Sequence, residues 1–223
     1  MIDELGRRMK RDYEDALRLY LPRRAYVVVR VDGRAFHAFT RGMERPYCRP
    51  LADALDSAAA VLCGEMIGCQ FAFGQSDEYS FLLNDAVWFD GNVQKIASVA
   101  ASVFTAAFAR AFPNDRDATF DARVLLIPQR SEVAQYFVWR QLDASANSLN
   151  MLASAHYSHK ELLGKSTAEK HDLLHAKGLN WANQPADFKR GRVVRPGEGG
   201  WIVDREVPVF QREPGYLDAL IPA

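Results

Sequence analysis

The sequence predicts an α+β fold in which strands and helices follow one another in the order β-α-β-β-α-β. Short runs of β-branched and aromatic residues alternate with longer segments whose apolar residues recur every three to four positions. The composition, 48% hydrophobic and 25% charged over 223 residues, is typical of a chain that buries a core. It excludes disordered tails and rod-like coiled coils.

The first elements are a helix, a strand and a second helix. Residues 1–20 place apolar side chains at helical spacing, at Ile2, Leu5, Met9, Tyr13, Leu17 and Tyr20. Pro22 ends this helix, and the β-branched run at 25–31 predicts a buried strand. Residues 51–66 repeat the helical spacing, and Pro50 suits the first turn of a helix there.

A hairpin, a helix and a fourth strand follow. Two strand-like runs, 70–74 and 79–83, are joined by four polar residues, which is typical of a hairpin. Residues 93–111 outline a third helix, and residues 122–127 a fourth strand. This order is ferredoxin-like: two helices are expected to cover one face of an antiparallel sheet.

The C-terminal third is more polar and predicts a helical and short-strand appendage. We expect one domain over residues 1–130, including the N-terminal helix, and an appendage over 131–223 packed on it. Two Ser-x-x-Glu capping boxes, at 158–161 and 166–169, predict helix starts. Two short strand-like runs follow, at 201–203 and 207–210.

Charge and cysteine content restrict the function classes. Lys plus Arg equals Asp plus Glu at 28 each, which argues against a strong non-specific nucleic-acid binder. Cys48, Cys63 and Cys69 form no CxxC pair, and no hydrophobic leader precedes them. We therefore expect free thiols, a cytoplasmic location and no membrane association.

Two acidic positions are predicted to meet at one edge of the sheet. In this order the third strand lies beside the first, so the end of strand one adjoins the hairpin turn. Asp32 follows strand one, while Asp77 and Glu78 occupy that turn. Carboxylates without a His/Cys cluster favour a hard ion such as Mg²⁺. Taken singly, Asp-Gly is most often only a turn, and Ser-Asp-Glu a solvated loop.

Two segments then identify a resemblance. Residues 28–37 and 74–81 resemble the signature motifs of the tRNA-histidine guanylyltransferase superfamily, with further similarity at 120–123, 139–141, 164–166 and 188–191. The resemblance implies a polymerase palm that uses two Mg²⁺ ions to add nucleotides from GTP or ATP to the 5′ end of tRNA. It also implies a homo-oligomer, expected to be a tetramer.

The resemblance implies roles for individual residues. The metal ligands would be Asp32, the Gly33 carbonyl and Asp77, and Glu78 would either support the site or join the metal shell. Nucleotide contacts would come from Asp32, Gly33, Arg34, Ala35, Phe36, His37, Arg45, Ser76, Asp77 and Lys95. Arg45 stands where relatives often carry lysine, and Lys95 has the alternative reading of a solvated helix lysine.

One segment departs from the family pattern. Eukaryotic members carry His-Ile-Asn-Asn, whereas residues 143–148 place a serine at the histidine and keep only Asn147 of the asparagine pair. The chain is therefore more similar to the bacterial and archaeal guanylyltransferase-like branch, which repairs truncated tRNA against a template. The alternatives are untemplated guanylate addition to histidine tRNA, a non-catalytic palm-like RNA-binding module and nucleotide cyclisation.

The C-terminal third also carries a predicted basic strip for tRNA phosphates. Besides Asn147 it comprises Lys160, Lys165, Lys170, Lys189, Arg190, Arg192 and Arg195. The alternative is a salt-bridged surface. Four histidines, at 156, 159, 171 and 175, have spacings that zinc ligands also use, but a solvated surface is the favoured interpretation.

Overall fold

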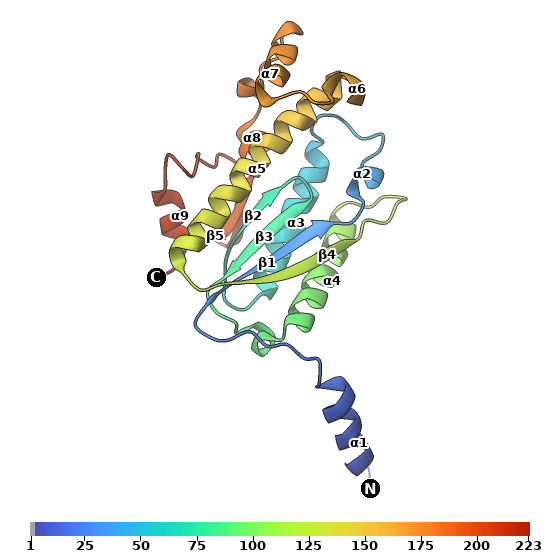
Figure 1. Ribbon diagram of the computed structural model, residues 1–223, viewed down its shortest axis with the longest axis vertical. Helices are drawn as coiled ribbons and strands as arrows, with labels where there is room; N and C mark the ends of the chain where they lie inside the picture. Colours follow the sequence, from blue (N-terminus) through green and yellow to red (C-terminus); the bar gives the residue numbers. More distant parts are fainter. Residues whose placement is uncertain (1–2) are drawn as a thin grey trace.

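The computed structural model describes residues 3–223 and contains one six-stranded antiparallel sheet, in the order β4-β1-β3-β2-β5-β6 (Figure 1). Its strands are β1 (Tyr26–Gly33), β2 (Cys69–Gln75), β3 (Glu78–Leu83), β4 (Phe120–Ile127), β5 (Arg192–Gly197) and β6 (Gly200–Asp204). The predicted neighbourhood of strands one and three is confirmed, because Val31 pairs with Tyr79. The four strands predicted before residue 130 are all present.

Helices cover both faces of this sheet (Figure 1). Helices α3 (Arg49–Glu65) and α4 (Val93–Ala111) pack on one face, as predicted, and α5 (Arg130–His156) crosses the other. Side chains alternate along β1, so Val27 and Val29 join the α3/α4 core while Val28 joins the core beneath α5. This alternation leaves the end of β1 between two helical layers.

The C-terminal third continues the sheet. Strand β5 pairs with β2, and β6 pairs with β5. The predicted strand at 207–210 is wrong: Val207 and Phe210 are buried beneath α5, where they fill the core without joining the ladder. The smaller helices are α2 (Phe36–Phe39), α6 (His159–Leu162), α7 (Thr167–Ala176), α8 (Ala186–Arg190), α9 (Gly215–Leu220) and the 3₁₀ turns Trp88–Gly91 and Trp181–Asn183.

The N-terminal helix projects from the body instead of packing on it (Figure 1). Helix α1 (Asp3–Met9) passes into a π-helical turn, Lys10–Glu14, so it ends before the predicted residue 20. Ile2, part of the prediction, lies outside the described residues. Leu17 is 80% exposed, so the apolar stripe has no partner in the described chain. No helix of residues 3–223 is long and apolar enough to cross a membrane.

Candidate active site at the sheet edge

Two acidic side chains meet where β1 ends and β2 turns into β3. Asp77 lies in a two-residue turn, because Gln75 pairs with Glu78 across it. A Cβ placed on Gly33 would lie 2.5 Å from Asp77 Oδ2, so this carboxylate contacts the end of β1. Asp32 and Asp77 line the same cleft. The sequence prediction that these two positions converge is therefore confirmed.

Burial and like charge act together on Asp77. Burial raises its pKa most, and the negative charge of Asp32 raises it further. The Ser76 hydroxyl opposes this by donating a 2.9 Å hydrogen bond to Asp77 Oδ1. Two carboxylates that disfavour each other's charge are stabilised by a bound cation.

Glu78 forms ion pairs with two arginines. Its carboxylate lies 2.6 Å from Arg140 Nη2 and 3.1 Å from Arg30 Nη2. Burial raises the pKa of Glu78, while Arg140 and then Arg30 lower it. Arg30 also lies 3.6 Å from Asp32, so Glu78 and Asp32 share one guanidinium. Of the two roles left open by the sequence, this geometry favours support of the site.

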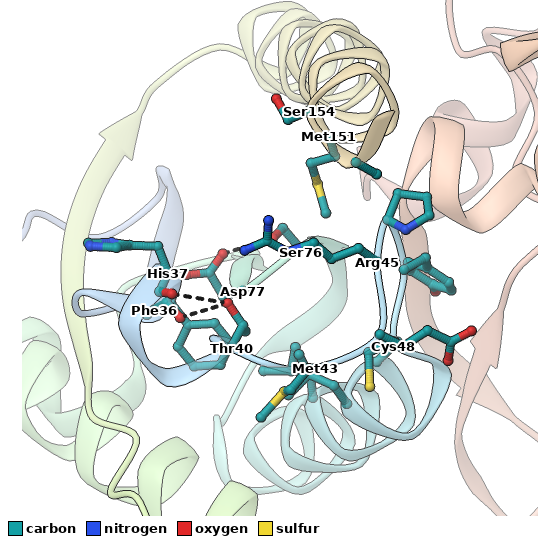
Figure 2. A pocket seen from close by; sticks show the side chains of 18 of the residues that line it. Phe36, His37, Thr40, Met43, Arg45, Cys48, Ser76, Asp77, Met151 and Ser154 are labelled. Carbon is teal, nitrogen blue, oxygen red and sulfur yellow. Dashed lines mark hydrogen bonds between the residues drawn. The ribbon is translucent and has the colours of Figure 1, made fainter. Parts of the chain in front are cut away.

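A cavity of about 600 Å³ opens beside the carboxylates. Figure 2 shows Asp77 and Phe36 on one side, Cys48 and the segment of Arg45 on the other, and Met151 and Ser154 of α5 above. The lower wall is apolar and comes from the start of α3. Asp77 thus makes one end of the cavity acidic, while the lining away from it combines apolar side chains of α3 with charged ones such as Arg45.

The predicted nucleotide residues lie around this cavity unequally. Gly33, Ala35, Phe36, His37, Arg45, Ser76 and Asp77 line it, whereas Asp32 and Arg34 do not; Asp32 lines the adjoining cleft that it shares with Asp77. The Arg34 amide donates to the Thr119 carbonyl, so this amide is not available to a phosphate. Phe36 also packs against Phe108 and Phe120 in the core. The contacts with nucleotide remain predictions.

Lys95 is not brought to this cavity. It lies in the first turn of α4, with its ammonium 4.7 Å from the centroid of the Phe89 ring. Phe108, which contacts Phe36, lies about 20 Å further along the same helix. Lys95 lines a separate depression together with Asp121. Lys95 therefore does not line the cavity described above, and its contact with a nucleotide remains a prediction.

The predicted basic strip is divided. Lys160 and Lys165 are exposed near α6, and Lys165 pairs with Glu169 at 2.9 Å. Lys189 and Arg190 lie half-buried on α8. Arg192 does not belong to a surface strip, because it is 1% exposed and paired with Asp56. Within residues 3–223, no three His, Cys, Asp or Glu side chains are arranged as a metal cage.

The carboxylates nevertheless suit Mg²⁺. This ion is usually held by one or two carboxylates plus substrate phosphates and water, and it needs no complete protein cage. Asp32, Asp77 and the Gly33 carbonyl offer only oxygen donors, beside a cavity large enough for a nucleotide. The donor set therefore fits the predicted magnesium better than zinc.

Sequence reasoning missed part of the wall. Asn150, Met151 and Ser154 face the carboxylates from α5, at three, four and seven residues after Asn147. That spacing marks one helix face, and it was available in the sequence. Tyr47, a further cavity residue, gave no such signal.

Comparison with known proteins places this geometry among relatives. The profile of the tRNAHis guanylyltransferase family matches residues 7–128. The chain is 31% identical over 218 residues to the tRNA(His) guanylyltransferase of Schizosaccharomyces pombe, covering 87% of this chain and 84% of that one. The Saccharomyces cerevisiae enzyme is 31% identical over 202 residues, covering 78% and 84%.

Solved structures show the same similarity. A bacterial tRNA(His) guanylyltransferase (Thg1)-like protein in complex with ATP has a TM-score of 0.93 and 39% identity, covering 99% of this chain and 100% of that one. Another, in complex with GTP, has a TM-score of 0.84 and 35% identity, with the same coverage.

Proposed function

This chain belongs to the tRNAHis guanylyltransferase family and is a nucleotidyltransferase that acts on tRNA, and from that premise we propose that it extends the tRNA 5′ end in the 3′-to-5′ direction. In this proposal β1–β4, α3 and α4 serve as a ferredoxin-like polymerase palm. The observation that carries it is the pair Asp32 and Asp77 at one sheet edge, beside a cavity of nucleotide size.

The residues divide the work of phosphoryl chemistry, which relies on positioning and charge stabilisation. Asp32, Asp77 and the Gly33 carbonyl would hold two Mg²⁺ ions, which would supply neutralisation of phosphate charge and activation of the attacking hydroxyl. Ser76 and Arg45 bind the triphosphate of ATP or GTP. Glu78, held by Arg30 and Arg140, keeps Asp32 in place.

The α5 segment supports templated repair of truncated tRNA. Asn147 lines the cleft of the carboxylates, and its amide donates to Asp143 at 3.2 Å. Ser148, in place of the family asparagine, is buried and accepts a 3.0 Å hydrogen bond from Trp181. The segment therefore lacks the side chains associated with histidine-tRNA selection. Untemplated guanylate addition is the second candidate, favoured by the names of the relatives.

One experiment separates these candidates. The protein is incubated with Mg²⁺, each labelled NTP in turn, and either 5′-truncated tRNA or full-length histidine tRNA. Templated repair predicts incorporation of the nucleotide complementary to the opposite strand. Addition of guanylate alone, whatever that strand carries, would favour the second candidate. Mg²⁺-dependent RNA binding without incorporation would leave only a binding module.

Further parts of the proposal concern partners and assembly. Lys160, Lys165, Lys189 and Arg190 would contact tRNA phosphates together with Asn147. We also propose a homo-tetramer in the cytoplasm, and light scattering after size-exclusion chromatography tests the assembly. A salt titration of tRNA affinity tests the phosphate contacts, because each lost contact lowers the slope of log K against log salt.

A further inference from the structure

A buried polar network lies beneath the cavity and connects distant parts of the chain. Arg192 Nε donates to Asp56 Oδ1 at 2.6 Å, and its Nη2 donates to the Tyr79 hydroxyl at 2.7 Å. Arg192 and Asp56 are each only 1% exposed. The second Asp56 oxygen accepts from Arg205 at 2.7 Å. The charges are thus paired, as burial in a low-dielectric interior demands.

Tyr47 joins this network to the wall of the cavity. Its hydroxyl donates to Asp187 Oδ2 at 2.9 Å and lies 3.5 Å from Arg192 Nη1. Burial, the largest effect, raises the pKa of Tyr47 to about 12, so the hydroxyl remains a donor at neutral pH. The ring packs against Phe188 at 5.2 Å between centroids. Residues of the C-terminal third therefore hold the segment that follows Arg45.

Both Tyr47 and Arg192 line the cavity that we propose for the nucleotide. The phosphates belong at the acidic end, where Asp77 lies, so the base extends toward the end formed by Tyr47 and the apolar side chains of Leu51 and Leu55. A guanidinium has five N–H donors, and the protein engages three of those of Arg192. Each of its three nitrogens has a partner, and the two N–H groups left over, one on Nη1 and one on Nη2, are available to an acceptor on the ligand.

We propose that Tyr47 and Arg192 form the base-binding end of the cavity, and that Asp187 and Asp56 position them. The ligand class is a nucleobase that presents a carbonyl oxygen or ring nitrogen to Arg192. The C-terminal third then determines nucleotide affinity, while the chemistry stays with the carboxylates. This inference rests on the proposed function, since it assumes that the cavity binds an NTP.

Calorimetric titration with GTP and Mg²⁺ tests the inference on the full chain. Tyr47→Phe removes only the hydroxyl and is expected to raise the Kd for GTP roughly 3- to 10-fold, because the ring loses the hydrogen bond to Asp187 that holds it in the cavity wall. Arg192→Lys is expected to raise it by about 10-fold or more, because lysine does not reproduce the guanidinium fork. Tyr216→Phe is the matched control: it removes a hydroxyl that donates to Asp204 at 2.7 Å, outside the cavity.

The kinetic readout distinguishes base binding from general damage. In Tyr47→Phe, KM for the NTP rises while kcat at saturation stays within about twofold, and the melting temperature falls no more than in Tyr216→Phe. An unchanged Kd in Tyr47→Phe overturns the inference even if Arg192→Lys fails to fold. A lower kcat at unchanged Kd overturns it too. If the wild-type protein binds no GTP, the proposed function itself fails.

Discussion

At the scale of single residues, the site brings together acidic side chains whose negative charges repel one another in the absence of a bound cation. Burial and the charge of Asp32 both raise the pKa of Asp77, so its ionised form is disfavoured in the protein alone. Burial raises the pKa of Glu78 as well, but Arg140 and Arg30 reduce this effect. Neighbouring carboxylates thus differ in their partners: Glu78 is paired with two arginines of the protein, whereas no arginine pairs with Asp77 in the described chain.

Asp32→Asn and Asp77→Asn should each lower nucleotide addition at least about 100-fold, because a neutral amide does not hold the metal ion. Asp77→Asn should leave the free energy of unfolding unchanged or raise it, since it removes a buried charge facing Asp32. Labelled-NTP incorporation and denaturant titration measure these two quantities. Asp121→Asn is the control, as Asp121 lies opposite Asp32 on β4 but is exposed. Full activity in either active-site variant would exclude the proposed metal site.

Position 33 has no room for a side chain, so it requires glycine. An added Cβ would lie 2.5 Å from Asp77 Oδ2 and 2.6 Å from the Phe36 ring, so Gly33→Ala must displace one of them. We expect activity to fall at least about 100-fold, because a shift of this size misplaces the reacting groups. Gly64→Ala, on helix α3 with only Trp201 nearby at 3.8 Å, should keep activity and stabilise the helix by about 0.5–1 kcal/mol. Equal activity of the two variants would contradict this account.

The sequence predicted the acidic residues well because their positions follow from topology. Asp32 and Asp77 are adjacent once strand three lies beside strand one, and local pattern sets that order. Lys95 was assigned from the resemblance and not from topology; its helix was predicted correctly, but Lys95 lies at the end of that helix distant from Phe36, outside the cavity lining. The buried pair of Arg192 and Asp56 was missed, and Arg192 was assigned to the surface strip, because two buried charges that neutralise each other leave no mark in a hydrophobicity pattern.

At the scale of elements, the capping-box motifs predicted helix starts in the polar C-terminal third correctly. Both predicted boxes are complete, and that of α7 joins Ser166 and Glu169. Strand β5 was missed, since its run is short and lies between arginine, glycine and proline residues. The strand predicted at 207–210 had the right composition but pairs with no strand of the sheet; Val207 and Phe210 instead fill the core beneath α5, so tertiary packing overrode propensity.

Ser166→Ala should selectively weaken helix α7. The Ser166 side chain accepts from the Glu169 amide at 3.3 Å, and losing such a cap costs about 1 kcal/mol. Faster hydrogen exchange of the α7 amides, with exchange of the β-sheet amides unchanged, would show that helix α7 alone is weakened. Ser98→Ala is the control, because Ser98 is an exposed serine inside α4 that caps nothing. Equal exchange in both variants would count against the cap.

The cap should also depend on pH. Hydrogen bonds from Lys165, the largest effect, and from the Ser166 amide lower the pKa of Glu169 from 4.5 to about 2. Because the pKa of Glu169 is lower in the folded state than in the unfolded state, its carboxylate stabilises the folded helix at pH values above 4.5. This stabilisation is lost as the pH falls from 4.5 toward 2. Glu169→Gln should therefore speed α7 exchange at pH 7 and have little effect near pH 2. A pH-independent difference would contradict the assignment.

At the scale of the whole molecule, the C-terminal third completes the core and the site at once. Strand β5 extends the sheet beside β2, while α5 covers the face on which Asp32 lies. The same third supplies Arg192 and Asp187 beneath the cavity. The domain boundary expected near residue 130 therefore separates parts that share a sheet, a core and a cavity wall.

A fragment of residues 1–130 should consequently not fold by itself. It would expose Val28, Phe71, Phe73 and Leu82, which α5 and the C-terminal residues bury. At about 1.5–3 kcal/mol per large apolar side chain, the loss approaches the roughly 5–15 kcal/mol that stabilises a typical domain. Residues 15–223 form the control, because no residue of Asp3–Glu14 is buried, and this truncation keeps the Leu19 carbonyl and Tyr20 that pair with the start of α4. We expect one cooperative thermal transition for the full chain and for 15–223, and none for 1–130. A dispersed NMR spectrum of 1–130 would instead establish the palm as an independent domain, with the C-terminal third as a true appendage.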